Sequence, residues 1–166
     1  GRLAIELVRR YPMWFSHLIL ISTRVGLLDS EPPEERLQWQ KNWEKRILQD
    51  SWGSWTKDWN NQAIFSGDQT HWSMKENEAT PEALAHALEA WSVLNQPYGF
   101  KDLAEIKVPT LWLSGDSDRK MRELMLVTQK NHPQGEFKSI EAAGHRIPLD
   151  QPHRLVQHIN EFIKKG

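Results

Sequence analysis

The stretch VPTLWLSGDSD, residues 108–118, decides the fold. Its first part, residues 108–113, predicts a β-strand, and the small polar turn from Gly115 to Asp118 ends that strand. A helix is expected to follow, through about Asn131. A strand that passes through a tight turn into a helix is typical of a parallel sheet covered by helices. The carboxylate of Asp118 is therefore expected at the C-terminal edge of such a sheet.

The flanking segments continue this alternation. Downstream, we expect a short strand at 137–140, the small-residue turn AAGH at 142–145, and an amphipathic helix over 152–163. Upstream, residues 17–22 predict a buried strand, because a continuous apolar run suits a parallel sheet covered on both faces. Before that strand, apolar residues at helical spacing predict a helix whose stripe consists of Leu3, Ala4, Leu7 and Val8.

The middle of the chain, residues 27–97, has a helical character throughout. Ser30 precedes an acidic, proline-containing start and predicts a helix that runs to about Gln49. Thr80 predicts a second helix start, with the helix continuing to about Leu94. Between these two helices, tryptophans recur at helical spacing and predict an aromatic face.

These patterns predict an α/β fold: the C-terminal part of a parallel sheet with an inserted helical lid. Residues 1–26 and 98–166 are expected to form the α/β core, and residues 27–97 the lid. At 166 residues the chain has the length of one ordinary domain.

Composition excludes several classes of function. The net charge is −1 with both signs interleaved, so no basic face for nucleic acid is expected. The chain has no cysteine, which excludes disulfides and thiolate metal sites. The apolar run 18–21 is too short to span a bilayer, and the first residues do not form a signal peptide. We therefore expect a cytoplasmic protein with no membrane span.

Among the seven histidines, His145 is the candidate for chemistry. It follows a predicted strand and a turn of small residues, so its side chain is expected at the same sheet edge as Asp118. A carboxylate there accepts the Nδ1 proton of the imidazole, which fixes the tautomer and stabilises the imidazolium when the ring acts as a base. His153 and His158 are five positions apart, the wrong spacing for one helical face, so no metal site is expected.

A nucleophile is the missing member of this set. A serine on a Gly-x-Ser-x-Gly turn between strand and helix would complete it, and the chain contains no such motif. Gly1-Arg2-Leu3-Ala4 is typical of the residues that follow the nucleophile as its helix begins. We therefore expect the serine within a few residues before Gly1.

In these three places the sequence resembles the α/β-hydrolase superfamily, with its members in the order Ser, Asp, His. The motifs are residues 1–4, the turn 115–118 and Ala-Gly-His at 143–145. They imply an α/β-hydrolase fold, and they leave the reaction open, because that fold carries many chemistries.

The predicted lid resembles one family more narrowly, the 2-succinyl-6-hydroxy-2,4-cyclohexadiene-1-carboxylate synthases. The resemblance rests on residues 26–28, 34–36, 58–65 and 95–97. It implies a lyase of menaquinone or phylloquinone biosynthesis that eliminates pyruvate from 2-succinyl-5-enolpyruvyl-6-hydroxy-3-cyclohexene-1-carboxylate without a cofactor. In that family the triad is thought to abstract a proton.

The same resemblance implies which residues bind the substrate, a small anionic carboxylate. Arg2 and Arg36 would hold its carboxylates, because arginine offers charged, bidentate recognition. Trp59 would form a wall of the pocket, with Phe65 beside it. Lys75 falls where the family has a further arginine, and lysine keeps the charge without the planar fork. From the residues alone, Arg36 also fits a solvated charge, and Trp59 also fits the packing core of the lid.

Two alternatives remain at this stage. One is an esterase or carbon–carbon-bond hydrolase of the same fold, which needs no arginine cluster for a neutral substrate. The other is a catalytically inactive fragment with only a binding or structural role, since residues 1–166 by themselves lack the expected nucleophile.

Overall fold

The computed structural model describes residues 1–165 and forms two compact units. Unit 1 consists of residues 1–25, 63–71 and 100–166, and unit 2 consists of residues 26–62 and 72–99. The short segment 63–71 thus belongs to unit 1, although it lies within the range expected for the helical insert.

Unit 1 is built on a parallel sheet of three strands in the order β1-β2-β3. The strands are β1 (Leu18–Ile21), β2 (Thr110–Gly115) and β3 (Glu136–Ile140). Every residue of the central strand β2 is buried, as expected for a strand covered on both faces. The strands predicted at both flanks and in the deciding stretch are therefore confirmed, to within a few residues at their ends.

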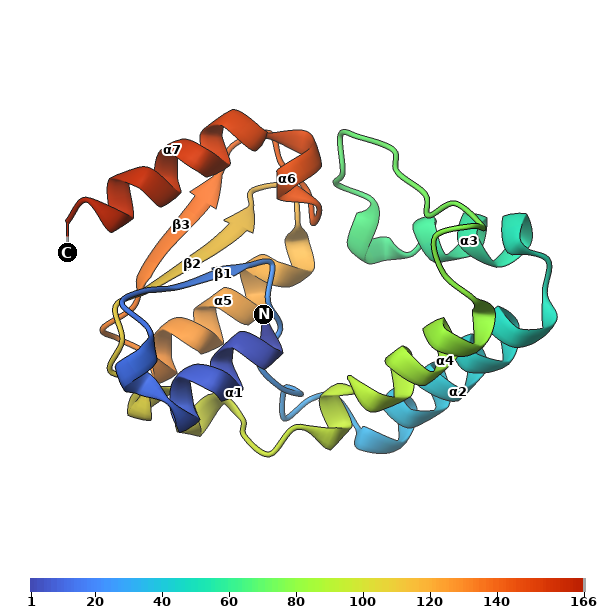
Figure 1. Cartoon of the computed structure of the whole chain (residues 1–166), viewed down its shortest axis with the longest axis horizontal. Coiled ribbons are helices and arrows are strands. Elements are labelled where there is room, and N and C mark those ends of the chain that lie inside the picture. The colour runs from blue at the N-terminus through green and yellow to red at the C-terminus, as the bar shows by residue number, and fades with distance from the viewer. Residues whose placement is uncertain (166) are drawn as a thin grey trace. The chain divides into compact units, whose positions relative to one another are not determined.

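Helices cover both faces of this sheet (Figure 1). On one face lies α7 (Pro152–Ile163), preceded by the short helix α6 (Ile147–Asp150). The other face carries α1 (Arg2–Arg10) and α5 (Arg119–Asn131). The remaining elements of unit 1 are the short 3₁₀ helices η1 (Pro12–Trp14), η2 (Ala63–Phe65) and η4 (Phe100–Glu105).

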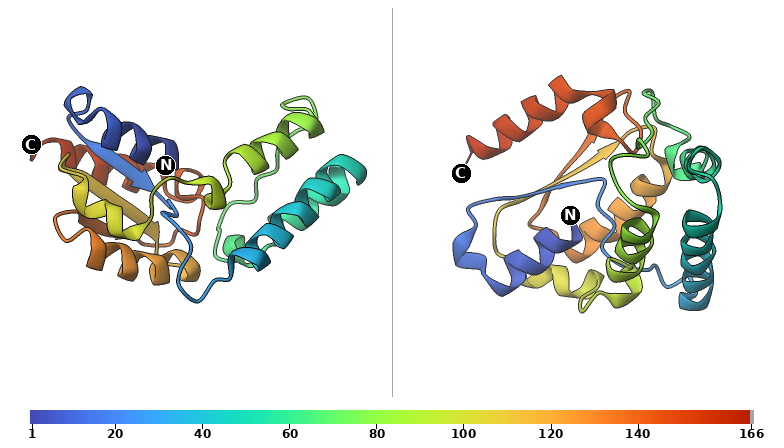
Figure 2. Two further views of the ribbon diagram at one scale, coloured as in Figure 1. Left: turned by 90° about the horizontal axis from the view of Figure 1, so that it is seen from below. Right: turned by 45° about the vertical axis from the view of Figure 1, so that its right-hand side comes forward.

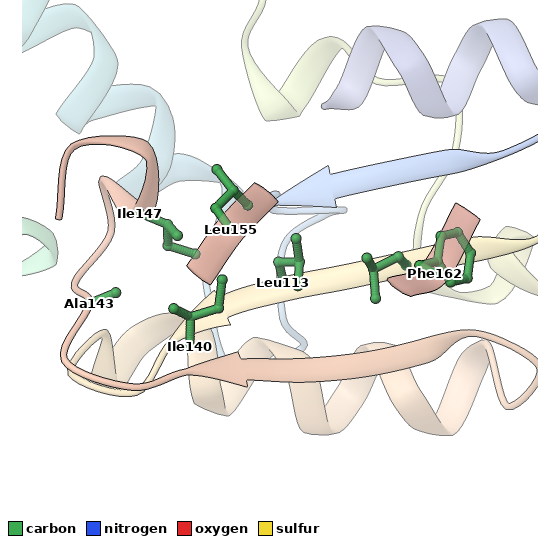
Figure 3. Packing of buried hydrophobic residues seen from close by; sticks show 7 residues of the cluster. Leu113, Ile140, Ala143, Ile147, Leu155 and Phe162 are labelled. Carbon is green, nitrogen blue, oxygen red and sulfur yellow. The ribbon is translucent and has the colours of Figure 1, made fainter. Parts of the chain in front are cut away.

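The core beneath α7 joins the sheet to the segment after β3 (Figure 3). Alternate residues of a strand point to opposite faces, so Leu111 and Leu113 of β2 both point toward α7. Leu155 and Phe162 of α7 pack against them. Completing this cluster are Ile140, Ala143 and Ile147, which come from the end of β3 and the segment behind it.

The buried face of α1 differs from the predicted stripe. Ile5 and Val8, three positions apart, are buried, whereas Leu3 and Leu7 are 49% and 36% exposed. The predicted helix is confirmed; of the predicted stripe Val8 is buried, whereas Leu3 and Leu7 are exposed and Ile5, outside the stripe, is buried in their place. At 3.6 residues per turn, Ile5 and Val8 lie on one side of the helix, and Leu3 and Leu7 lie on roughly the opposite side.

Among the residues that the structure describes, unit 2 contains helices and no strand. It consists of α2 (Pro33–Gln49), α3 (Trp52–Asn60), α4 (Pro81–Ala90) and the 3₁₀ helix η3 (Val93–Asn95). Helices α2 and α4 lie side by side (Figure 2). A cluster of buried residues holds the unit together, formed by Ile47, Trp55 and Ala85.

Two helix ends in unit 2 differ from those predicted. The helix expected after Ser30 begins at Pro33, because a residue before proline avoids the α conformation, and Pro32 is accordingly extended. The helix expected to reach Leu94 ends at Ala90, since Ser92 starts a separate turn by accepting a hydrogen bond from the N–H of Leu94. The predicted N-cap is confirmed: Thr80 Oγ1 accepts the N–H of Ala83 at 3.2 Å.

Candidate active site

Asp118 and His145 meet at the C-terminal edge of the sheet. Asp118 follows the turn after β2, and His145 lies on the loop after β3. Because β2 and β3 are parallel neighbours, both loops leave the sheet at the same edge. The Nδ1 atom of His145 lies 2.7 Å from Oδ2 of Asp118.

The two side chains differ in their access to solvent. That of Asp118 is 1% exposed and that of His145 is 23% exposed. A buried carboxylate that accepts the Nδ1 proton leaves Nε2 without a proton, so Nε2 can take one from a reacting group. The hydrogen bond to Asp118 can therefore hold the imidazole in one tautomer and one orientation.

Asp118 also caps helix α5. Its Oδ1 accepts the N–H of Met121 at 3.0 Å. Asp116 instead accepts the Ser117 hydroxyl at 3.1 Å and, at 3.4 Å, the N–H of Ala143. Asp116 thereby links the Asp118 loop to the His145 loop and does not cap the helix.

Three residues near His145 were not anticipated from the sequence, namely Asp68, Arg146 and Asp150. Asp68 lies opposite the backbone of the His145 loop, and its Oδ2 is 3.4 Å from Nη1 of Arg146. Burial lowers the pKa of the Arg146 guanidinium, while the charges of Asp68 and Asp150 oppose that shift.

Asp150 is an acceptor for backbone groups on two segments. Burial by itself would raise the pKa of its carboxyl, but hydrogen bonds from the N–H groups of Gly144, Gln69 and Thr70 outweigh that effect. The net result is a pKa below the ordinary value for aspartate. The charged form of Asp150 therefore stabilises the folded state.

The arginine and lysine candidates fall in both units. Arg2 is the first residue of α1 in unit 1 and is half-buried. Arg36 lies on α2 in unit 2, where its Cζ is 3.9 Å from the centroid of the Trp39 ring. Lys75 is exposed on the segment before α4, where its backbone N–H donates to Glu78.

Trp59 packs in a cluster with two other tryptophans of unit 2. Its ring meets that of Trp43 edge to face, with 4.9 Å between centroids, and lies 6.0 Å from that of Trp39. Such edge-to-face pairs add to the stability of a packed cluster. Phe65, expected beside Trp59, lies in unit 1, where its ring centroid is 5.7 Å from that of His145.

Within residues 1–165, no three metal-ligating side chains gather into a possible metal site. No helix in the same part of the chain is long and apolar enough to cross a membrane.

No protein-family model matches the chain, whereas curated sequence relatives do. A Bacillus subtilis (strain 168) protein provisionally named 2-succinyl-6-hydroxy-2,4-cyclohexadiene-1-carboxylate synthase is 27% identical over 98% of the chain. The synthase of that name from Yersinia pseudotuberculosis serotype O:3 (strain YPIII) is 28% identical over 90% of the chain. The chain spans 62% and 54% of the lengths of these two relatives.

Comparison with solved structures finds proteins that share the fold of this chain. MenH from S. aureus superposes with a TM-score of 0.83 at 24% identity, over 99% of the chain and 65% of that protein. A thermophilic esterase from Thermogutta terrifontis superposes with a TM-score of 0.71 at 25% identity, over 99% of the chain and 61% of the esterase. The chain has the α/β-hydrolase fold and is related in sequence, along nearly its whole length, to 2-succinyl-6-hydroxy-2,4-cyclohexadiene-1-carboxylate synthases.

Proposed function

We propose that the full-length protein eliminates pyruvate from 2-succinyl-5-enolpyruvyl-6-hydroxy-3-cyclohexene-1-carboxylate, in menaquinone or phylloquinone biosynthesis. The observation that carries the proposal is the pair of His145 Nδ1 and Asp118 Oδ2 at 2.7 Å, in a chain whose relatives are named for this reaction. In the elimination, a base removes a ring proton and a new ring double bond forms. The bond between the ring carbon and the enolpyruvyl oxygen breaks, and that group leaves as the enolate of pyruvate, which takes up a proton at its methylene carbon to give pyruvate.

The role of His145 follows from its hydrogen bond. With Nδ1 held by Asp118, its Nε2 accepts the proton of a serine, and the serine oxygen then removes the proton from the substrate ring. Asp118 stabilises the imidazolium that forms. No acyl-enzyme is required, because the bond that breaks is not an ester that the serine attacks.

The proposal places this serine on a turn that leads into α1. Gly1 supports it on steric grounds, since a Cβ at this position would lie 2.0 Å from Oγ1 of Thr23. A side chain at position 1 would force Thr23 to move, and a glycine at the entry of the helix matches the last position of Gly-x-Ser-x-Gly. Arg2, the first residue of α1, would then lie next to the reacting groups.

The substrate carries several carboxylates, and the cations of the chain are proposed to bind them. Arg2 and Arg36 would each hold a carboxylate through two parallel N–H donors, and Lys75 would add a further charge. Trp59 would contribute the edge of an aromatic wall beyond its packing role in unit 2. The helices of unit 2 are proposed to act as the lid.

The decisive assay measures pyruvate release by the full-length protein, with lactate dehydrogenase and NADH as the reporter. We expect release from the enolpyruvyl substrate, and we expect its loss in a His145→Ala variant. A well-folded full-length protein that releases no pyruvate would overturn the proposal.

An ester hydrolase is the second candidate, and the similarity to the thermophilic esterase favours it. Such an enzyme would use the same Asp118–His145 pair to activate a serine that attacks the ester carbonyl. Turnover of p-nitrophenyl acetate by the full-length protein, in the absence of any pyruvate release, would select this candidate over the lyase.

A further inference from the structure

The loop that carries His145 starts in a strained conformation. Ala142 has a φ of 54°, in the left-handed region that costs a non-glycine residue about 1–2 kcal/mol. Strain of this kind persists only where the surroundings hold the backbone in place. The contacts that hold residues 142–146 therefore control where the imidazole lies.

Asp68 provides the first of these contacts, from a segment 77 residues earlier in the chain. Its Oδ1 accepts the backbone N–H of His145 at 2.6 Å and that of Arg146 at 3.2 Å. The side chain is 5% exposed, so water does not compete freely for these bonds. Two adjacent N–H groups on one oxygen fix the backbone at His145.

The loop also approaches Asp68 too closely for any side chain at position 144. A Cβ on Gly144 would lie 2.3 Å from Oδ1 of Asp68 and 2.4 Å from its backbone nitrogen. The segment and the loop are therefore packed backbone against backbone, and small displacements of one are transmitted to the other.

Asp150 fixes the same loop and the same segment to one another. Its Oδ2 accepts the N–H of Gly144 at 2.8 Å, while Oδ1 accepts those of Gln69 and Thr70 at 3.0 and 2.7 Å. The Thr70 hydroxyl in turn donates to the carbonyl oxygen of Leu149. Asp150 thus bridges the two backbones from the far side of the loop.

The segment touches the imidazole itself through Phe65. The ring of Phe65 meets that of His145 edge to face, and the guanidinium of Arg146 lies 3.9 Å from the Phe65 centroid. The 63–71 segment therefore contacts both the ring and the backbone of the histidine.

We propose that Asp68 is a positioning residue for His145. By holding the backbone N–H of His145 and Arg146, it keeps the imidazole aligned with Asp118, and it makes this alignment depend on the segment 63–71. That segment continues into unit 2 at both of its ends, through Gln62 and Trp72. The inference rests on the proposed function only in taking His145 as the base.

The geometry separates the acceptor role of Asp68 from its charge. Asp68→Asn keeps an oxygen at the same distance from the backbone and removes the charge. Asp68→Glu keeps the charge and moves the oxygens by one methylene. Positioning therefore predicts near-normal behaviour for the asparagine variant and a defect for the glutamate variant, whereas an electrostatic role predicts the reverse. Both changes are conservative, so folding is expected to survive.

The experiment measures kcat and KM for pyruvate release by the full-length protein, together with the low-field proton NMR signal of the His145–Asp118 hydrogen bond. For Asp68→Glu we expect kcat to fall by about 10- to 100-fold, with KM changed by less than about threefold, and the proton signal to broaden or vanish. For Asp68→Asn we expect kcat within about fivefold of the parent and an intact signal. Matched changes at the exposed Asp29, to Asn and to Glu, should alter neither quantity.

The proposal is overturned if Asp68→Glu keeps the parent kcat and proton signal, or if Asp68→Asn loses as much as Asp68→Glu. The NMR signal needs no substrate, so it decides the positioning role even if the protein releases no pyruvate. Failure of the lyase assignment and failure of this inference are thereby distinguishable.

Discussion

Asp118 and His145 are joined by only one oxygen of the carboxylate. Oδ2 of Asp118 lies 2.7 Å from Nδ1 of His145, while Oδ1 accepts the N–H of Met121 and caps helix α5. The start of the helix thus fixes the carboxylate that orients the imidazole. In the proposed function this one side chain serves both stability and chemistry, and substitution can separate the two roles.

Replacing Asp118 by asparagine should remove the catalytic role and keep the cap. Asparagine is as good an N-cap as aspartate, so the free energy of unfolding should change by less than about 0.5 kcal/mol. It cannot accept the Nδ1 proton as a carboxylate does, so kcat for pyruvate release should fall by about 10³- to 10⁴-fold. Asp118→Ala should lose about 1 kcal/mol more stability through the cap. Kinetics and thermal unfolding of the full-length variants measure both quantities.

Thr80 offers a matched control for this pair, because it caps α4 and has no histidine partner. Thr80→Ala should cost about 1 kcal/mol of stability and leave kcat unchanged. An Asp118→Asn variant with the parent kcat would show that His145 does not depend on this carboxylate.

The contact between Asp118 and His145 could be predicted from the sequence for a simple physical reason. Each residue follows a strand, and parallel neighbours present their C-terminal ends at one edge. The contribution of Asp68 was not accessible, because its partners are backbone N–H groups 77 and 78 positions away. Every residue except proline carries a backbone N–H, so no spacing or motif in the sequence indicates such a contact.

The fold too was predictable where local sequence patterns determine the structure. Its prediction failed where contacts between distant segments decide. A continuous apolar run predicted β1, and a serine or threonine followed by proline predicted the starts of α2 and α4. The predicted stripe of α1 was wrong at Leu3 and Leu7 and omitted Ile5, because leucine and isoleucine are similarly apolar and only tertiary packing selects which of them is buried. The inclusion of segment 63–71 in unit 1 depends likewise on Asp68 and Asp150, which bind loops distant in sequence.

Asp150 should contribute to the loss of folding stability at acid pH. Its pKa is lowered in the folded state, so its stabilisation is complete above the unfolded value near 3.8 and is lost as the pH falls through the folded value. At pH 7, Asp150→Asn should reduce the free energy of unfolding by about 1–2 kcal/mol, because backbone donors lose a charged acceptor. The difference from the parent should shrink below about pH 4. Urea unfolding from pH 3 to 7 measures it.

Glu136 is the control for Asp150, because its pKa is also lowered, chiefly by a hydrogen bond from Lys165 at the surface. Glu136→Gln should change stability by no more than about 1 kcal/mol, and the change should fade in high salt. Equal effects of the two substitutions would contradict a special role for Asp150.

His132 should make the fold sensitive to mild acid. It is fully buried, its Nδ1 accepts the indole N–H of Trp112 at 3.0 Å, and burial lowers its pKa below 6.5. The unfolded chain therefore takes up a proton near pH 6.5 that the folded state resists. Stability should be fully present above that pH and should fall as the pH drops from about 7 toward 5.

His132→Gln should remove this dependence, although it should also lower stability at pH 7. The exposed His153 is the matched control, and His153→Gln should leave the slope of stability against pH as in the parent. Urea unfolding at steps between pH 5 and 8 gives that slope. An unchanged slope in His132→Gln would exclude His132 as its source.

Substitution of Arg36 distinguishes the proposed lyase from the proposed ester hydrolase. If it holds a substrate carboxylate, Arg36→Ala should cost about 1.5–3 kcal/mol of binding, which raises KM by about 10- to 100-fold. Arg36→Lys should recover part of this, because it keeps the charge without the bidentate fork. A hydrolase of neutral esters should keep its KM in both variants.

The stacking of Arg36 on Trp39 requires a stability control, because losing it should by itself cost about 0.5–1 kcal/mol of folding free energy. Arg46 provides that control on the same helix. Its guanidinium lies 5.1 Å from the Trp43 ring centroid and pairs with Asp50 and Asp58. Arg46→Ala should lower thermal stability without raising KM. If Arg36→Ala behaves like Arg46→Ala, losing stability alone, then Arg36 supports the packing of unit 2 and does not bind the substrate.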